Sequence, residues 1–369
     1  MVDTHAGLYV HVPFCRAKCA YCTFSSVTAV GEVSAWVEAV LAEADRYRDR
    51  LGPFGTLYVG GGTPSLLGPA ELRKLLGGLR ARFSFAPGCE ITLEANPEDV
   101  LWDMAALWRD EGIERISVGV QSFDDVFLKK LGRRHTARQA LTALETLRRA
   151  GCANLSVDLM WALPGQTLDQ WERTLEEVLS FEPEHLSCYE LTVEEGTPLA
   201  GAVSRDSLPD EASACVFFRK TSQLLRRRGY IHYEISNYAR SPVLVSRHNV
   251  KYWRHVPYLG LGPAAHSFDG QSRWANERSL KRYVAGMRQG VSVVRFREKL
   301  SAEQRRLERL FLGFRTGEGV SVDMVGATPE ARDAARRAVR RGLLRLHDDR
   351  LVPTLKGWLI ADRLPLLFP

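Results

Sequence analysis

Residues 11–22 read His11-Val12-Pro13-Phe14-Cys15-Arg16-Ala17-Lys18-Cys19-Ala20-Tyr21-Cys22. The three cysteines have the spacing C-x-x-x-C-x-x-C, which brings three thiolates onto one tight loop. Three thiolates suit three corners of an iron–sulfur cube and leave the fourth iron without a protein ligand. An open iron of this kind can bind and reduce a small molecule.

A structural zinc site is the alternative interpretation of these cysteines. Zinc takes four nitrogen or sulfur ligands in a closed tetrahedron, so a distant Cys or His would have to complete the set. Zinc frameworks usually combine two C-x-x-C pairs, or a Cys pair with a His pair, and the chain has no second pair. The other cysteines stand alone in apolar or helical segments and are typical of small buried hydrophobes: Cys89, Cys152, Cys188 and Cys215. The spacing favours a cluster over zinc.

Length and composition predict a globular chain of about two domains, with 369 residues of which 45% are hydrophobic. The N-terminus lacks the pattern of a signal peptide, and no stretch approaches the roughly 18 apolar residues of a membrane span. Seven cysteines, three of them clustered, are typical of metal ligation in a reducing compartment and not of a disulfide framework. We therefore expect a cytoplasmic protein without a membrane span.

The charge balance gives only a weak indication of partners. The net charge is +6, from 50 Lys and Arg against 44 Asp and Glu. Basic runs at Arg226-Arg227-Arg228 and at Arg336-Arg337 with Arg340-Arg341 could attract phosphates or anionic lipid. Solvated helix faces are the simpler interpretation, and we expect no nucleic-acid partner.

Short apolar, β-rich runs alternate with helical patterns of ten or more residues. The runs lie at 8–12, 56–59, 90–94, 115–119, 155–159, 185–191 and 230–235. Strands joined by crossover helices run parallel, so the sheet is a barrel or an open parallel layer. About six such units favour an incomplete (β/α)6 barrel, whose active site should lie at the carboxyl ends of the strands.

Polar residues stand at or near several of these strand ends. Gly60-Gly61-Gly62-Thr63-Pro64 follows one strand, and its glycines would let the backbone approach a ligand closely. Glu94 ends the next strand and could bind ribose hydroxyls, while Gln121 lies just past the one after it. Asp158 lies inside an apolar run, where an acid needs a partner.

The C-terminal segment, residues 296–369, is predicted to be a separate, smaller unit. Ser301-x-x-Gln304 has the spacing of a capping box and opens a helix through about Phe314; a second helix covers Pro329 to Arg341. Two short apolar runs, 343–346 and 351–352, and a final helix from Thr354 complete a winged-helix-like pattern. Such folds sometimes bind DNA and often serve only as packing or partner domains.

These motifs together resemble the radical S-adenosylmethionine (SAM) superfamily. The cysteine motif with Tyr21 before its last cysteine and the Gly60–Pro64 loop carry the likeness. Residues 8–14 (LYVHVPF), 119–123 (GVQSF) and 158–167 (DLMWALPGQT) look like its oxygen-independent coproporphyrinogen III oxidase branch. The resemblance covers nearly the whole chain and implies a partial (β/α)6 barrel over residues 1–235.

The resemblance implies a [4Fe–4S] cluster held by Cys15, Cys19 and Cys22, with SAM on the open iron. In such proteins the cluster supplies an electron that cleaves the sulfonium of SAM to methionine and a 5′-deoxyadenosyl radical. By position, these residues match those that line the SAM site in the family: Tyr9, Gly61, Gly62, Thr63, Glu94, Gln121, Arg133 and Asp158.

Two departures argue against oxidative decarboxylation of coproporphyrinogen. The oxidase proper has a further Cys two residues after the third ligand, where this chain has Phe24. It also has a longer N-terminal arm that contributes to its active site, whereas the first ligand here is already residue 15.

His248-Asn249-Val250-Lys251-Tyr252-Trp253 has the pattern H-N-x-x-Y-W, which is similar to the mark of the haem chaperone group within this family. A His beside aromatic residues offers an axial nitrogen and stacking surfaces for a flat macrocycle, and Tyr252 offers an oxygen ligand. The alternative is a satisfied His among packing aromatics. His266, in a glycine-rich turn, is a lesser ligand candidate. Residues 236–295 would then form a connector that carries the haem-binding motif.

The sequence therefore predicts a protein that binds haem and hands it to an acceptor protein, for which a membrane respiratory enzyme is a candidate. It would carry the cluster and SAM without being primarily an enzyme. The alternative is a true radical enzyme, either an oxygen-independent coproporphyrinogen III dehydrogenase or another oxidoreductase of porphyrin metabolism.

Overall fold

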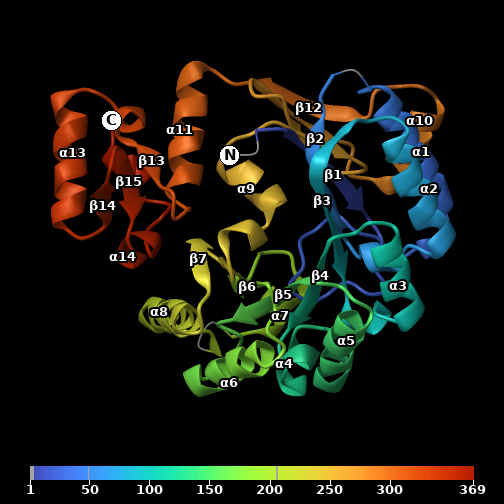
Figure 1. Ribbon diagram of the computed structural model, residues 1–369, viewed down its shortest axis with the longest axis horizontal. Helices are drawn as coiled ribbons and strands as arrows, with labels where there is room; N and C mark the ends of the chain where they lie inside the picture. The colour runs from blue at the N-terminus through green and yellow to red at the C-terminus, as the bar shows by residue number, and fades with distance from the viewer. Residues whose placement is uncertain (1–3, 49, 205–206) are drawn as a thin grey trace.

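A computed structural model describes residues 4–48, 50–204 and 207–369. Residues 1–3, at the start of the predicted barrel domain, residue 49, and residues 205–206 lie outside the described residues. In the described ranges, one twelve-stranded sheet with helices on its outer face forms the body, and a three-stranded sheet lies in a separate C-terminal unit (Figure 1). No helix in these ranges is long and apolar enough to cross a membrane.

Six parallel strands form the centre of the large sheet, in sequence order. They are β1 (Ala6–Val12), β2 (Phe54–Gly61), β3 (Phe85–Ala95), β4 (Arg115–Gln121), β5 (Asn154–Trp161) and β6 (His185–Glu190). The helices between and after them are α1 (Val33–Asp45), α2 (Pro69–Arg80), α3 (Trp102–Asp110), α4 (Asp125–Lys130), α5 (Ala137–Arg149), α6 (Leu168–Leu179), α7 (Pro198–Ala202) and α8 (Glu211–Arg227). Single 3-10 turns are Val30–Glu32, Pro64–Leu66, Pro97–Asp99, Pro242–Leu244 and Pro365–Leu367. The predicted partial (β/α)6 barrel is confirmed.

The two faces of the central strands differ in chemistry because successive side chains point to opposite sides. Leu8, Val10 and Val12 of β1 are buried in the core shared with the helices. The alternate positions, Tyr9 and His11, face the inside of the barrel and are hydrogen-bonded to each other at 3.0 Å. The apolar face thus packs the helices, and the polar face lines the interior.

The strand predicted at 230–235 is antiparallel, which corrects the expectation of parallel strands throughout. β7 (Ile231–Glu234) pairs antiparallel with β8 (Asn237–Ala239), and β8 pairs antiparallel with β6. Only Ile235 and Ser236 join β7 to β8, and a link of two residues can make a hairpin but no crossover.

Residues 236–295 are more than the expected connector. They contain α9 (Arg247–Trp253), β9 (Tyr258–Leu261), β10 (His266–Phe268), β11 (Ser272–Asn276) and α10 (Leu280–Arg288), followed by β12 (Val294–Lys299). β9 pairs parallel with β1, and β10, β11 and β12 continue the sheet by antiparallel pairing. β9 and β10 have only four and three residues, which is too short to give a clear period in sequence, so the pairing identifies them.

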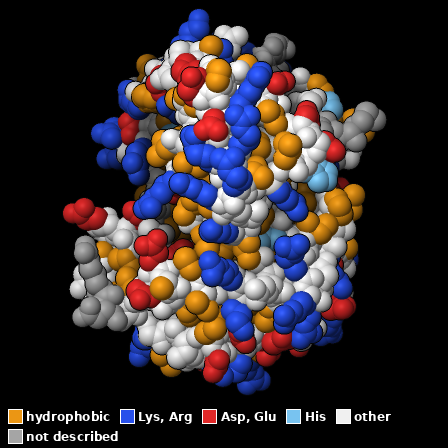
Figure 2. Space-filling view, turned by 90° about the vertical axis from the view of Figure 1, so that its left-hand side faces the viewer, with side chains coloured by type: hydrophobic (Ala, Val, Ile, Leu, Met, Phe, Trp, Pro, Cys, Tyr) orange, Lys and Arg blue, Asp and Glu red, His pale blue; other side chains and the backbone are white. Residues whose placement is uncertain are grey.

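The C-terminal unit has the predicted winged-helix-like order. It consists of α11 (Ala302–Gly313), β13 (Val320–Ser321), α12 (Val322–Val325), α13 (Pro329–Arg340), β14 (Leu344–His347), β15 (Arg350–Pro353) and α14 (Leu355–Trp358). Ser301 and Gln304 form the predicted capping box. The unit has its own hydrophobic core around Leu310 and Phe314. Many Lys and Arg side chains lie on the face of the molecule where this unit is located, the left-hand side of Figure 1 (Figure 2).

Candidate functional site

Cys15, Cys19 and Cys22 are free thiols that line one cavity of about 420 Å³ inside the barrel. Backbone hydrogen bonds fix their loop: Cys15 N donates to Val27 O at 3.0 Å, and Ala20 N donates to Leu131 O at 3.0 Å. The described residues around this cavity include no fourth cysteine. Three thiols are the number that a cluster with one open corner takes from the protein. Among the described residues, no three His, Cys, Asp or Glu side chains are placed to share a single metal ion.

Two side chains donate hydrogen bonds toward the thiol sulfurs. Thr63 Oγ1 lies 3.5 Å from Cys15 Sγ, and an Arg133 guanidinium nitrogen lies 3.5 Å from Cys19 Sγ. Such outer partners orient metal ligands and stabilise their charge. Burial raises the pKa of Cys22, and the neighbouring Cys19 and Cys15 raise it further. A positively charged metal centre would lower the pKa of Cys22 again, because it favours the thiolate form.

Two buried carboxyl groups face the same cavity. Glu94 accepts hydrogen bonds from Tyr58 Oη at 2.7 Å and Gly61 N at 2.9 Å, and Asp158 accepts one from Ser117 Oγ at 3.2 Å. Burial is the main cause that raises the pKa of Glu94 to about 7 and that of Asp158 to about 6. A cationic ligand would lower both pKa values, so the pair suits a molecule with a positive charge.

The glycines at the end of β2 and directly after it serve the packing of the protein itself. Gly62 N donates to Val12 O at 2.7 Å, and a Cβ on Gly62 would come within 2.6 Å of Phe14 O. Gly61 has φ +110, and a Cβ there would meet the His11 ring at 2.5 Å. These glycines therefore bring the end of β2 against the cysteine loop, which places Thr63 beside Cys15.

All but one of the residues matched to a SAM site line this cavity: Gly61, Gly62, Thr63, Glu94, Gln121, Arg133 and Asp158. Gln121 has φ 66, a backbone conformation rare for residues other than glycine and often found at binding sites. Tyr9 lies instead in a neighbouring cavity of about 630 Å³. Polar atoms of Thr92, Arg115 and Arg133 are buried without hydrogen-bond partners among the described residues, and all three residues line the first cavity. The cavity therefore fits a polar ligand.

Of the lining residues on β4, β5 and β6, the sequence pointed to Gln121 and Asp158 but not to the others, although a signal for them exists. On β4, β5 and β6, every second residue faces the cavity: Arg115, Ser117, Gly119, Gln121, Ser156, Asp158, Met160, His185, Ser187 and Tyr189. In these strands, residues at every second position are mostly polar and the residues between them are apolar. This alternation could have identified the lining residues.

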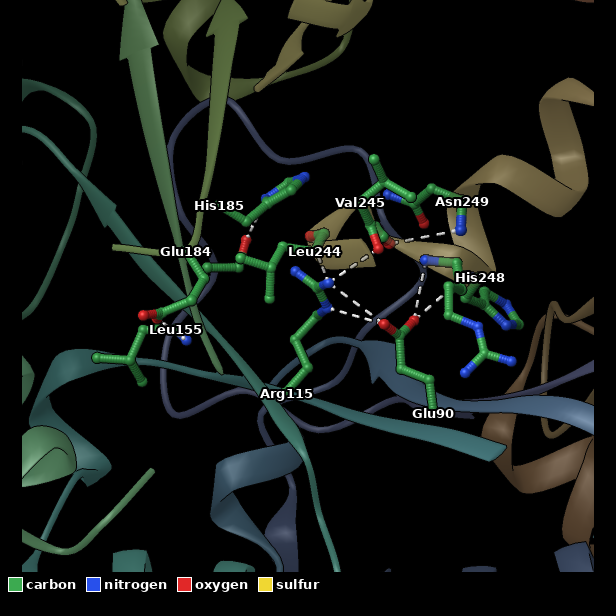
Figure 3. A network of polar contacts seen from close by, with 12 residues as sticks. Glu90, Arg115, Leu155, Glu184, His185, Leu244, Val245, His248 and Asn249 are labelled. Carbon is green, nitrogen blue, oxygen red and sulfur yellow. Dashed lines mark hydrogen bonds and ion pairs between the residues drawn. The ribbon is translucent and has the colours of Figure 1, made fainter. Parts of the chain in front are cut away.

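A buried ion pair joins the barrel wall to α9. Arg115 lies 3.2 Å from Glu90 and donates to the carbonyl oxygens of Leu244 and Val245 at 2.7 and 2.9 Å. The other Glu90 oxygen accepts from the backbone N of Arg247 at 3.0 Å and that of His248 at 3.3 Å. Figure 3 shows both side chains pointing at the chain segment that begins α9. The pair fixes the start of this helix across the barrel.

His248 is 1% exposed, and both of its ring nitrogens are engaged. Nδ1 is hydrogen-bonded to Thr56 Oγ1 at 2.8 Å, and Nε2 to Tyr252 Oη at 2.8 Å. Burial lowers the pKa of His248 to about 3, so the ring is neutral. A Cβ on Gly7 would come within 3.1 Å of this ring, so the glycine lets α9 pack onto β1. In this structure His248 offers no open nitrogen to a ligand, and Tyr252 shares its hydroxyl with it.

Comparison with known proteins agrees with this geometry. Residues 9–178 match the radical SAM superfamily, and residues 300–360 match the HemN C-terminal domain. The chain is 35% identical over 364 residues to the heme chaperone HemW of Mycobacterium tuberculosis, covering 96% of this chain and 93% of that protein. The chain belongs to the HemW family of radical SAM proteins. It is also 38% identical over 294 residues to HemW of Escherichia coli, covering 77% of this chain and 76% of that one.

The solved structure of coproporphyrinogen III oxidase (HemN) from Escherichia coli has the same fold. Its TM-score is 0.86 at 21% identity, and the match covers 100% of this chain and 91% of that chain. Membership of the radical SAM superfamily implies a [4Fe–4S] cluster and SAM. In this HemW family member, Cys15, Cys19 and Cys22 would hold the cluster, and the carboxyl groups of Glu94 and Asp158 would bind polar or cationic groups of SAM. Together the two groups supply a one-electron reductant and a source of a carbon radical.

Proposed function

We propose that this chain is a haem chaperone that binds haem and transfers it to an acceptor protein. The observation that carries the proposal is the similarity over 96% of the chain to a protein named heme chaperone HemW. That alignment includes the segment beyond the six parallel strands, where the H-N-x-x-Y-W helix and the C-terminal unit lie. We place the activity in the cytoplasm, with a membrane respiratory enzyme as a candidate acceptor.

The cluster and SAM are part of the proposal. Three thiols, two carboxyl groups and unpartnered polar atoms converge on one cavity, which supports retention of the radical SAM apparatus. We propose that occupancy of this cavity governs haem transfer. The Glu90–Arg115 pair supports this idea, because it links the wall of that cavity to α9.

The second candidate is an oxygen-independent coproporphyrinogen III dehydrogenase. The complete cavity and the HemN-like fold favour it. Phe24 disfavours it, because this residue takes the place of the further cysteine expected in the oxidase. Phe24 lies beside the cysteine loop and is 63% exposed. Its apolar ring can contact a flat macrocycle but cannot bind a metal ion.

One experiment separates the two candidates. The anaerobically reconstituted protein is titrated with haem, and in parallel incubated with coproporphyrinogen III, SAM and a reductant. A chaperone binds about one haem per chain and forms no protoporphyrinogen, whereas turnover at enzyme-like rates would reject the chaperone. A subsequent incubation with an apo-acceptor should move the haem absorbance to the acceptor fraction.

A nucleic-acid regulator is the third, least supported candidate. The arginines on and after α13 are exposed: Arg332, Arg336, Arg337, Arg340 and Arg341. Arg336 and Arg337 pair with Asp333, which lowers the free positive charge of this face. We expect no DNA affinity that depends on these arginines, and a salt-dependent affinity lost on their neutralisation would overturn that expectation.

A further inference from the structure

A second cavity, of about 630 Å³, lies beside the cluster cavity on the inner face of the sheet extension. Its walls come from segments far apart in the sequence: Tyr9 and His11 of β1, residues 23–25 after the cysteines, Tyr252 of α9, Tyr258 of β9, and residues of or next to strands β10 to β12. Both ring nitrogens of His11 are engaged, by Tyr9 and by the Ser25 carbonyl. The volume lies within the range of about 300–1,000 Å³ that is usual for sites of small organic molecules. Phe24 lines this cavity and the cluster cavity, so it stands between them.

Aromatic surface at this cavity is left open to solvent. Phe24 is 63% exposed and Phe296 is 49% exposed. Tyr252 and Tyr258 pack edge to face behind them, with ring centroids 4.6 Å apart. Large aromatic side chains that stay uncovered together are typical of binding surfaces. Flat rings on several sides favour a flat, apolar ligand.

His266 is an accessible nitrogen donor in the same cavity. It is exposed at the start of β10, and among the described residues neither of its ring nitrogens has a hydrogen-bond partner. The sheet register places it opposite Ala275, and Ala275 opposite Phe296, so the three side chains stand in a row on one face. Burial, with Arg278 and Arg273 nearby, lowers the pKa of His266 and keeps the imidazole in its neutral, metal-binding form.

Positive charge lies at the rim of the cavity. Arg278 is exposed, lines the cavity, and forms no ion pair through its guanidinium among the described residues. Arg295 also lines the cavity but pairs with Glu277 at 3.0 Å. Arg278 is therefore the better placed group for a carboxylate of a ligand.

The cleft between the barrel and the C-terminal unit is larger, about 1310 Å³, but the described residues that line it include no histidine with an open ring nitrogen. His232 in that cleft is 9% exposed; its Nδ1 is bonded to Ser222 Oγ at 2.9 Å and its Nε2 to Ile235 O at 3.3 Å. The Tyr233 hydroxyl is hydrogen-bonded to His185 at 2.7 Å. The large cleft therefore fits a tetrapyrrole by size but not by ligation.

We propose that haem binds in the cavity between Phe24 and Phe296, with His266 as the axial ligand of iron and Arg278 facing a propionate. The inference rests on the proposed haem-binding function. His248 then acts as a positioning residue that holds Tyr252 in the cavity wall, and not as the iron ligand. Because Phe24 follows the cysteine loop by two residues, the haem would lie next to the cluster and SAM.

The test is a titration of ferric haem and, separately, of metal-free protoporphyrin IX into four proteins: wild type, His266→Ala, His248→Gln and His347→Ala. His347→Ala is the matched control, because His347 is an exposed histidine on β14, outside the cavity. His266→Ala should lose the histidine-ligated haem spectrum and at least tenfold in haem affinity, yet bind protoporphyrin IX as wild type does. Free imidazole should restore the spectrum of His266→Gly.

His248→Gln and His347→Ala should keep the wild-type haem spectrum. The inference is overturned if His266→Ala keeps spectrum and affinity, or if His248→Gln alone loses the ligated spectrum while circular dichroism shows it folded. If wild type binds no haem, the proposed function itself fails; if wild type binds and His266→Ala is unchanged, only the site is wrong. Phe24→Ala and Phe296→Ala should weaken both haem and protoporphyrin IX.

Discussion

The ring of Tyr58 stacks on the imidazole of His248, with the centroids 5.0 Å apart. The hydroxyl of the same tyrosine donates to Glu94 at 2.7 Å. One side chain of β2 thus contacts the proposed SAM site with its polar end and the H-N-x-x-Y-W helix with its face. This contact gives a physical route by which the occupancy of one site can affect the position of α9.

Substitutions at Tyr58 should separate these two contacts. Tyr58→Phe removes the hydrogen bond to Glu94 and keeps the stacked ring, so SAM affinity should fall by about threefold to tenfold, as expected for a lost hydrogen bond of about 0.5–1.5 kcal/mol. Tyr58→Leu also removes the stack, so the amides of residues 247–253 should exchange faster. Calorimetric titration with SAM and hydrogen exchange measure the two effects. Equal exchange in Tyr58→Phe and Tyr58→Leu would show that the stack does not hold α9.

SAM binding should depend on pH through Glu94 and Asp158. Their pKa values of about 7 and about 6 mean that both lose charge as pH falls from 8 to 5, so the affinity for a cationic ligand should fall over this range. Glu94→Gln should bind SAM about tenfold more weakly at pH 8, a cost of about 1.4 kcal/mol, and should show a flatter profile. Glu38→Gln on α1, an exposed partner of Lys74, is the control. An unchanged profile in Glu94→Gln would assign the pH dependence to another group.

Glu94 should also make the stability of the fold depend on pH. The sign is opposite to that of SAM binding: stability should decrease as pH rises, whereas SAM affinity should increase. Burial raises the pKa of Glu94 from its ordinary 4.5 to about 7, so between these values the folded chain binds more protons than the unfolded chain. The free energy of unfolding of the ligand-free protein should therefore decrease as pH rises through this window. Urea denaturation at pH 5 and pH 8 measures the difference, which should be smaller in Glu94→Gln. A difference that is equal in both proteins would contradict the assignment.

Loss of one cysteine of the loop should abolish the cluster. After anaerobic reconstitution, Cys19→Ser should lack the iron–sulfur absorbance, because two thiolates cannot hold the cube. Cys215→Ser, at a free cysteine on α8 away from the cavity, should keep it. Iron, sulfide and zinc analysis completes the measurement. A colourless wild type with one zinc per chain would instead support the structural zinc site.

The ion pair between Glu90 and Arg115 should matter strongly for stability. Glu90→Gln leaves a buried guanidinium without its charge partner, which typically costs about 3–5 kcal/mol. The double variant Glu90→Gln, Arg115→Met should recover part of this loss, since it removes the unpaired charge. Urea midpoints measure both, with Lys74→Met in an exposed pair as a control that should cost less than about 1 kcal/mol. A loss below that value in Glu90→Gln would show that water reaches the pair.

Local patterns in the sequence predict the cysteine loop, the six parallel β/α units and the winged-helix-like unit. Their signals are local: a spacing of three cysteines, a period of two or 3.6, and capping residues such as Ser301, which caps α11 as predicted. The resemblance to the radical SAM superfamily named eight residues of a SAM site, and seven of them line the cluster cavity. Those at the ends of β2 to β5 meet there because parallel strands bring their carboxyl ends to one edge.

The surroundings of each histidine, in contrast, follow from tertiary packing. By sequence, His248 is the stronger ligand candidate and His266 the weaker, yet His248 is buried against Gly7, Thr56 and Tyr252, and His266 is open. The antiparallel edges and the separation of Tyr9 from the cluster cavity also arise from pairing between distant segments. Accessibility and hydrogen-bond saturation depend on which distant residues pack together, and a motif of six residues does not contain that information.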